Sequence, residues 1–190
     1  MEKTRIERAI EYITKLFQGN GDGHDLSHSL RVYKNALMIA KAEGQGEEEI
    51  IALSALLHDC DDHKLFHTEN NANARRFLEQ EKLSAEVIEE ICKNINSVSF
   101  SKNRGKAPET IEGKIVQDAD RLEAIGAVGI ARCFQFGGSH GRSLENSIEH
   151  FYDKLLLISK ELNTPSARKM AEKRDKLMQD FLKEWVEEMN

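Results

Sequence analysis

Apolar residues recur three and four positions apart along almost the whole chain, which is the period of an amphipathic α-helix. Ile6, Ile10 and Ile13 fall on one face of residues 2–18, and a run with three glycines at 19–23 then interrupts the pattern. No segment combines strict alternation with enrichment in β-branched residues, as a strand would. The pattern therefore predicts an all-α protein of roughly eight or nine helices.

Glycine-rich breaks, prolines and capping residues mark the ends of the expected helices. Asp25 is a candidate N-cap, and Pro108 is predicted to be the first residue of a helix. Gly137–Gly141 is predicted to be a break. The expected helical segments are about 2–18, 25–43, 47–58, 68–82, 84 onward, 108 to the break at 137, 145–161 and 165 onward.

A chain of 190 residues is expected to form one domain, and no linker or internal repeat divides it. At this length folding buries about 70% of the surface of the unfolded chain, so the fold needs no disulfide or structural metal. The three cysteines, Cys60, Cys92 and Cys133, are odd in number and lack CxxC spacing. This usage indicates a reducing compartment, and we expect a cytoplasmic protein.

The balance of 27 basic against 33 acidic residues gives a net charge of −6. This charge argues against a nucleic-acid polymer as partner, but a small anionic substrate stays open because a site can be locally basic. Residues 1–17 are charged and periodic, unlike a signal peptide. The longest small and apolar stretch, 124–131, is much shorter than the ~20 residues that span a bilayer. We therefore expect neither nucleic acid nor a membrane as partner.

Histidines lie near carboxylates in two short segments, at 23–28 and 58–63, and a third segment, 118–121, carries two further carboxylates. His58 and Asp59 end a buried helix, where both side chains can converge on one ion. His28 and Asp120 are candidates for a third and a fourth ligand from neighbouring helices. Two imidazoles and two carboxylates suit Mn²⁺, Fe²⁺, Co²⁺, Ni²⁺ or Mg²⁺ with open positions. The set is a poor match to a closed structural zinc site, which prefers thiolates.

These residues form an H…HD…D pattern that resembles the signature of the HD-domain metal-dependent phosphohydrolase superfamily. The segments GHDLSHSLRVYKNA, ALLHDCDDHK, IVQDADRLEAIGAVGIARCF and HFYDKLLLI resemble a single-domain bacterial subfamily with nucleotide pyrophosphohydrolase members. The resemblance covers most of the chain and implies the all-α HD fold. It implies a single HD domain over 1–190, with the motif core at about 24–135 and C-terminal packing helices at about 145–189.

The resemblance assigns His28, His58, Asp59 and Asp120 as ligands of one divalent metal ion, whose identity (Mn, Mg, Co, Ni or Fe) stays open. Asp62 lies three residues after Asp59 and resembles the acidic residue, usually Glu, that orients or deprotonates the attacking water in several HD families. We therefore predict Asp62 as the catalytic base.

Cationic side chains would hold the phosphates of a substrate. The candidates are Arg31, Lys64, Arg121 and the basic loop at 102–106. His24 and Asp25 are candidates for hydrogen-bond partners that orient the ligands. The alternative for these two is a loop residue and an N-cap.

Together these features predict a divalent-metal-dependent phosphohydrolase acting on a small phosphate ester, most simply a nucleotide. A nucleoside triphosphate pyrophosphohydrolase is favoured, by resemblance alone. The alternatives are a nucleoside monophosphate phosphatase, a non-catalytic metal- or nucleotide-binding sensor, and a helical interaction module. The base, the sugar, the number of phosphates and the oligomeric state stay open.

Overall fold

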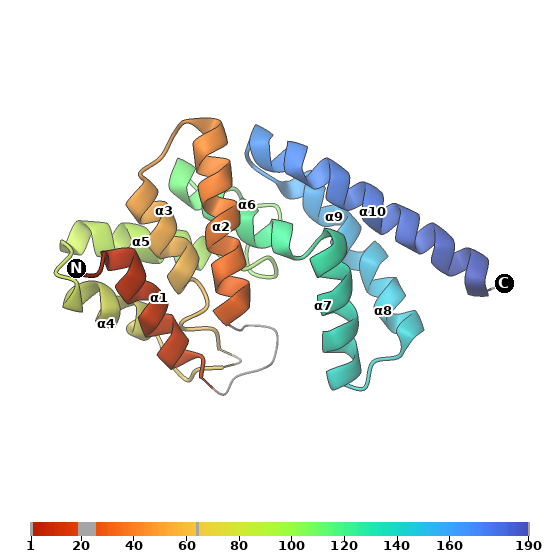
Figure 1. Ribbon diagram of the computed structural model, residues 1–190, viewed down its shortest axis with the longest axis horizontal. Helices are drawn as coiled ribbons and strands as arrows, with labels where there is room; N and C mark the ends of the chain where they lie inside the picture. Colours follow the sequence, from red (N-terminus) through yellow and green to blue (C-terminus); the bar gives the residue numbers. More distant parts are fainter. Residues whose placement is uncertain (1, 19–25, 64, 190) are drawn as a thin grey trace.

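The computed structural model describes residues 2–18, 26–63 and 65–189. All regular secondary structure in these ranges is helical, and they contain no strand (Figure 1). The predicted all-α class is confirmed. The candidate N-cap Asp25 lies outside the described residues.

The described residues form ten α-helical segments, one π-helical turn (η1) and one 3₁₀ turn (η2), the two turns lying in the C-terminal half. In order they are α1 (Arg5–Leu16), α2 (Leu26–Glu43), α3 (Glu48–Leu57), α4 (Ala72–Gln80), α5 (Ala85–Val98), α6 (Ile111–Glu123), α7 (Gly126–Ser139), α8 (Leu144–His150), η1 (Phe151–Leu155), α9 (Leu156–Ile158), η2 (Ser159–Glu161) and α10 (Pro165–Met189).

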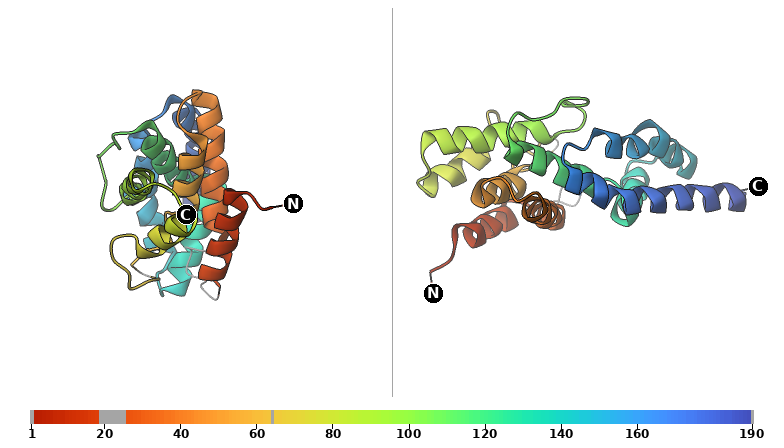
Figure 2. Two further views of the ribbon diagram at one scale, coloured as in Figure 1. Left: turned by 90° about the vertical axis from the view of Figure 1, so that its left-hand side faces the viewer. Right: turned by 90° about the horizontal axis from the view of Figure 1, so that it is seen from above.

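The molecule is elongated, with α1–α6 at one end of its long axis and α7–α10 at the other (Figures 1 and 2). One buried apolar cluster joins α1, α3, α4 and α5. A second cluster joins α2 and α6 to the C-terminal helices. Within it, the fully buried ring of Phe151 packs against Phe134 and Phe181, with centroids 6.0 and 5.7 Å away. The predicted division into a motif core at about 24–135 and packing helices at about 145–189 stays a prediction.

Helix α6 is fixed against the start of α10 by Asp118, which is fully buried. One of its carboxylate oxygens accepts hydrogen bonds from the backbone N–H and side-chain amide of Asn163, both at 2.8 Å. The other accepts from the backbone N–H and the hydroxyl of Thr164, also at 2.8 Å. Buried polar groups are costly unless they are paired, so these four bonds hold the last turns of α6 in one position.

Two predicted helix starts are wrong, because side chains cap the helices further along. Helix α6 begins at Ile111 rather than at Pro108, since the hydroxyl of Thr110 accepts a hydrogen bond from the N–H of Gly113 at 3.0 Å. Helix α4 begins at Ala72 rather than near Thr68, whose hydroxyl donates instead to Asp61 at 2.6 Å.

The predicted break at Gly137–Gly141 is also wrong in its first part, because α7 continues to Ser139. Gly137 is buried, and a Cβ at this position would lie 2.6 Å from the hydroxyl of Ser147 and 3.3 Å from Nε of Arg142. Close packing between helices, rather than a turn, accounts for this glycine.

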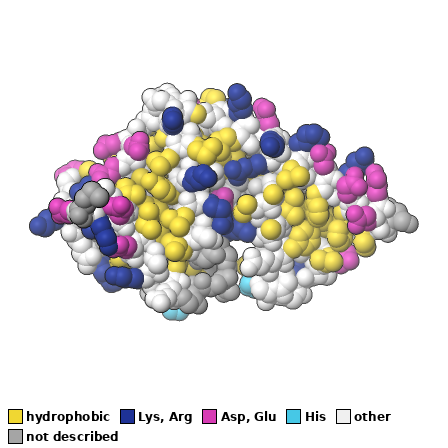
Figure 3. All heavy atoms as spheres, viewed as in Figure 1, with side chains coloured by type: hydrophobic (Ala, Val, Ile, Leu, Met, Phe, Trp, Pro, Cys, Tyr) yellow, Lys and Arg dark blue, Asp and Glu magenta, His cyan; other side chains and the backbone are white. Residues whose placement is uncertain are grey.

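Apolar side chains reach the surface in two separate areas on one face of the molecule, with Lys and Arg side chains gathered between them (Figure 3). The large exposed apolar residues include Val128, Leu177 and Val186. None of the described helices combines the length and the apolar character needed to cross a membrane.

Candidate metal centre and pocket

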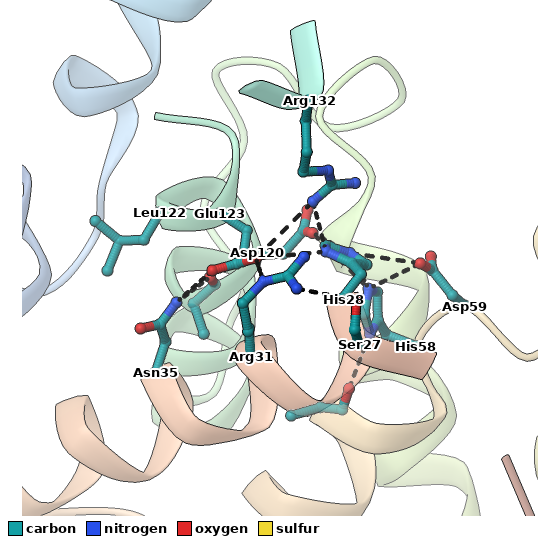
Figure 4. A network of polar contacts seen from close by, with 12 residues as sticks. Ser27, His28, Arg31, Asn35, His58, Asp59, Asp120, Leu122, Glu123 and Arg132 are labelled. Atoms are coloured by element: carbon teal, nitrogen blue, oxygen red, sulfur yellow. Dashed lines mark hydrogen bonds and ion pairs between the residues drawn. The ribbon is translucent and has the colours of Figure 1, made fainter. Parts of the chain in front are cut away.

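Three helices bring the predicted metal ligands together (Figure 4). His28 lies near the start of α2, His58 is the C-cap of α3, and Asp120 lies in the last turns of α6. Helix α2 packs against both α3 and α6. Helix α3 is buried along almost its whole length, so its C-terminal end delivers His58 and Asp59 to the interior.

The four side chains meet at hydrogen-bond distances. Nε2 of His28 lies 3.2 Å from Nε2 of His58 and 3.2 Å from Oδ1 of Asp120. Oδ2 of Asp59 lies 3.3 Å from Nε2 of His58 and 3.5 Å from Nε2 of His28. One ligand atom each of His28, His58 and Asp120 lies within 4.8 Å of the others. The structure therefore gathers all four predicted ligands, and their role as ligands stays a prediction.

The chemistry of these donors fits a divalent metal. Nδ1 of His58 donates to the backbone oxygen of Ala55 at 2.8 Å, so Nε2 is the nitrogen that faces His28 and Asp59 and would offer its lone pair to a metal once its proton is displaced. Metal-binding histidines in proteins are commonly fixed by such a bond. Two imidazole nitrogens and two carboxylates with space beside them are typical of catalytic rather than closed structural sites.

The same carboxylates perturb the titration of His58. Burial alone would lower its pKa, but the negative charges of Asp59 and Asp120 raise the pKa of His58 to about 9. Burial alone would raise the pKa of Asp120, but hydrogen bonding to His28 and the charges of both imidazoles lower it below its usual value. A cation entering this cluster therefore replaces a proton on His58.

Glu123 and Arg132 belong to the centre although the sequence did not reveal them as site residues. Oε2 of Glu123, a buried carboxylate, lies 3.9 Å from Nδ1 of His28, and a guanidinium nitrogen of Arg132 lies 2.6 Å from the same atom. Glu123 is therefore placed to orient the His28 ring when its other nitrogen binds a metal. The available signal was spacing, because Glu123 follows Asp120 by three residues and faces the same side of α6.

Two predicted phosphate contacts are engaged with other groups. Arg31 donates through Nε to Glu123 at 2.6 Å and through a terminal nitrogen to Ser27 at 3.0 Å. Arg121 is 2% exposed, donates to the backbone oxygen of Glu161 and lies 5.6 Å from the centre of the Phe100 ring. Arg121 lines the pocket, and Arg31 is not among its described lining residues. Phosphate binding by these two arginines stays a prediction.

Asp62 is half-buried and lines the pocket in the turn that follows α3. Its backbone N–H donates to the carbonyl oxygen of Asp59 at 3.1 Å, so it lies beside the centre. Its role as base stays a prediction. The remaining predicted site residues, His24, Asp25 and Lys64, lie outside the described residues.

A pocket of about 770 Å³ opens beside the centre. His28, His58 and Asp120 line one part of it, and the aromatic rings of Phe100 and Phe136 line another. This volume lies in the range of roughly 300–1,000 Å³ that is usual for small-molecule sites.

Comparison with known proteins identifies the family. The model of the HD domain matches residues 25–125, which is more than half of the chain. The chain belongs to the HD superfamily. It is accordingly a metal-dependent phosphohydrolase, as the four motif residues predicted. This HD hydrolase is 35% identical over 192 residues to the uncharacterized protein YpgQ of Bacillus subtilis, covering 96% of this chain and 93% of YpgQ.

Solved structures show the same fold over almost the full length. The crystal structure of Bacillus subtilis YpgQ in complex with ADP superposes with a TM-score of 0.83 at 32% identity, covering 96% of this chain and 97% of that one. An HD-superfamily hydrolase from Bacillus thuringiensis superposes with a TM-score of 0.81 at 34% identity, covering 98% and 99%. The predicted HD fold is confirmed.

Proposed function

We propose that this HD hydrolase cleaves nucleotides, with hydrolysis of a nucleoside triphosphate to the monophosphate and diphosphate as its favoured reaction. The observation that carries the proposal is one continuous pocket of about 770 Å³, which joins the His28–His58–Asp120 cluster to aromatic and cationic side chains. The YpgQ complex with ADP supports a nucleotide as the ligand.

The proposed ligands His28, His58, Asp59 and Asp120 would hold one divalent metal ion, which would polarise a phosphoryl oxygen and acidify the attacking water. Asp62 accepts a proton from that water. The water oxygen bonds to the α-phosphorus, the bond from this phosphorus to the bridging oxygen breaks, and the electron pair leaves with diphosphate.

The remaining groups of the centre hold these parts in place. Glu123 restrains the ring of His28 and is itself paired with Arg31. Arg132, beside His28, presents a cation at the edge of the metal centre, where a phosphoryl oxygen would bring negative charge. We also propose that the substrate is a small cytoplasmic metabolite, because all three cysteines are free thiols and the net charge of −6 disfavours a nucleic-acid polymer.

A substrate screen tests the proposal. The purified protein is incubated with Mn²⁺, Mg²⁺, Co²⁺ or Ni²⁺ and with nucleoside tri-, di- and monophosphates, and the release of phosphate and of pyrophosphate is measured separately. Pyrophosphate together with a nucleoside monophosphate is the expected result. Phosphate from a monophosphate would establish a phosphatase instead, and no turnover with any metal would indicate a sensor.

Variants of the cluster test the metal site directly. Asp59→Ala should lose bound metal and activity while its helical circular dichroism is retained. His67→Gln is the matched control, because His67 is exposed in the segment that follows and is absent from the described lining of the pocket. Unchanged metal content in Asp59→Ala would contradict the assignment.

A further inference from the structure

Carboxylates reach the pocket only from the part of the described chain before residue 125, whereas basic side chains line it from both parts, Lys102 and Arg121 among them. The acidic residues among its described lining come from positions 59–62 and from Asp120. After residue 125, the described lining residues include no carboxylate. The basic side chains among them are Arg132, Arg142, His150 and Lys154. The C-terminal helices therefore give the pocket a positive wall.

Aromatic rings hold two of these cations in place. The guanidinium of Arg142 lies 5.6 Å from the centre of the Phe136 ring, and its chain passes over Gly137, where a Cβ would approach Nε to 3.3 Å. The ammonium of Lys154 lies 5.3 Å from the centre of the Phe100 ring. Both charges are thus ordered at partly buried positions, where cation–π contacts are stronger than in open solvent.

The charges of Arg142 and Lys154 reach the same groups. Burial and both of these cations lower the pKa of His150, with Asp153 opposing them. Both cations also act on the buried thiol of Cys133. Among the described residues no carboxylate lies within ion-pair distance of Arg142. Positive groups gathered at the wall of a pocket repel one another and favour a bound anion.

The π-helical turn contributes to this arrangement. His150 precedes the turn Phe151–Leu155 and Lys154 lies inside it, and both side chains line the pocket. A π turn inserts one residue into a helix and re-aims the side chains that follow, and such turns are frequent at functional sites.

We propose that Arg142, His150 and Lys154 bind the phosphate groups beyond the phosphorus that is attacked, so that the diphosphate of a nucleoside triphosphate leaves into this cluster. The inference rests on the proposed function. Arg132 is the basic residue of this wall that contacts His28. Phe136, whose ring packs against the guanidinium of Arg142, follows Arg132 by one helical turn of α7, a rise of about 6 Å. Negative charge develops on the leaving diphosphate as the bond to the α-phosphorus breaks, and these cations lie where they stabilise it.

The test compares two substrates that share the attacked phosphorus. A nucleoside triphosphate carries the β- and γ-phosphates, whereas the p-nitrophenyl ester of the nucleoside monophosphate lacks them. Arg142→Gln and Lys154→Gln should each lower kcat/KM for the triphosphate by about tenfold or more, because each removes a charge-assisted contact. Both variants should hydrolyse the ester within about threefold of the wild-type rate.

A binding measurement gives a readout that does not depend on turnover. Inorganic pyrophosphate is titrated into the metal-loaded protein in a calorimeter, and its affinity should fall about tenfold in both variants. Lys160→Gln is the control, because Lys160 is exposed on the neighbouring turn η2 and is absent from the described lining of the pocket. It should behave as wild type in every assay.

Each outcome is decisive. Equal losses on both substrates, or unchanged values in both variants, would overturn the leaving-group site while leaving the proposed function in place. If the wild-type protein hydrolyses neither substrate, the proposed function fails, and the pyrophosphate titration still decides whether the cluster binds diphosphate. If Arg142→Gln loses helical circular dichroism, Lys154→Gln, on a different element, carries the same comparison.

Discussion

Replacing Asp61 by alanine should lower the free energy of unfolding by about 2–4 kcal/mol while the residues of the metal centre stay in place. The carboxylate of Asp61 accepts hydrogen bonds from the hydroxyl of Thr68 at 2.6 Å and from the backbone N–H groups of Asn73 and Ala74 at 2.9 and 3.0 Å. The N-cap residue of α4, Asn71, makes no side-chain capping bond, so Asp61 caps this helix from a distance.

The magnitude follows from these three bonds. Two buried backbone donors lose their acceptor, and each unsatisfied donor costs about 1–3 kcal/mol. Water partly replaces the carboxylate because Asp61 is only half-buried, which brings the total to about 2–4 kcal/mol. The loss is measured by urea denaturation of the metal-free protein, with Glu69→Ala as a control for removing an exposed carboxylate from the same segment.

The experiment also separates Asp61 from its neighbour Asp62. The metal content of Asp61→Ala should equal that of wild type, since the predicted ligands lie in α2, at the C-terminal end of α3 and in α6. A change in unfolding free energy below about 0.5 kcal/mol would refute the capping role, because even an ordinary N-cap contributes about that much.

Three further outcomes are expected. Asp62→Asn should keep its metal, and its rate of hydrolysis should fall by a factor of roughly 10²–10⁴, as is typical when a general base is removed. A fall of less than threefold would exclude Asp62 as the base. In the metal-free protein, unfolding free energy should fall by roughly 3 kcal/mol as pH rises from about 6.5 to about 9, because the raised pKa of His58 stabilises the fold only while the ring is protonated. In urea titrations, His58→Gln should show a smaller slope, since the raised pKa of His28 is then the one that remains of the two imidazoles. Removing the metal with a chelator should lower Tm only by the amount expected when a ligand of the native state is lost, and it should leave the far-UV circular dichroism unchanged. A loss of helicity would show that the metal is structural.

Local sequence predicted the helices well where their ends depend on neighbouring residues. Residues 47–58 were expected as a helix and α3 spans Glu48–Leu57, and Ser84 caps α5 by accepting a hydrogen bond from Val87. One error was local, because Thr110 caps α6 and moves its start beyond Pro108, and the others arose where distant groups decide. Asp61 displaces the start of α4, and packing against Ser147 explains a glycine that a local rule assigns to a turn.

The residues of the candidate site also fall into those that local sequence predicted and those that only the fold brings together. The ligand pattern was predictable because His58 and Asp59 are adjacent and the other two ligands lie in recognisable segments. Arg132 was missed because it lies 104 residues from His28 along the chain, in a helix without polar periodicity. Arg142 and Lys154 were missed because the fold alone brings them into the pocket.

The distance along the chain between the predicted ligands has a consequence for how the protein matures. His28 and His58 are 30 residues apart, and Asp120 arrives with a helix that is synthesised much later. A nascent chain that has reached the end of α3 has its two imidazoles but lacks α6, Glu123 and the anchor between Asp118 and Thr164. Isolated helices relax in about a microsecond, whereas closing loops of this length costs additional entropy. The predicted ligand set is therefore complete only after α6 has docked against α2 and α3.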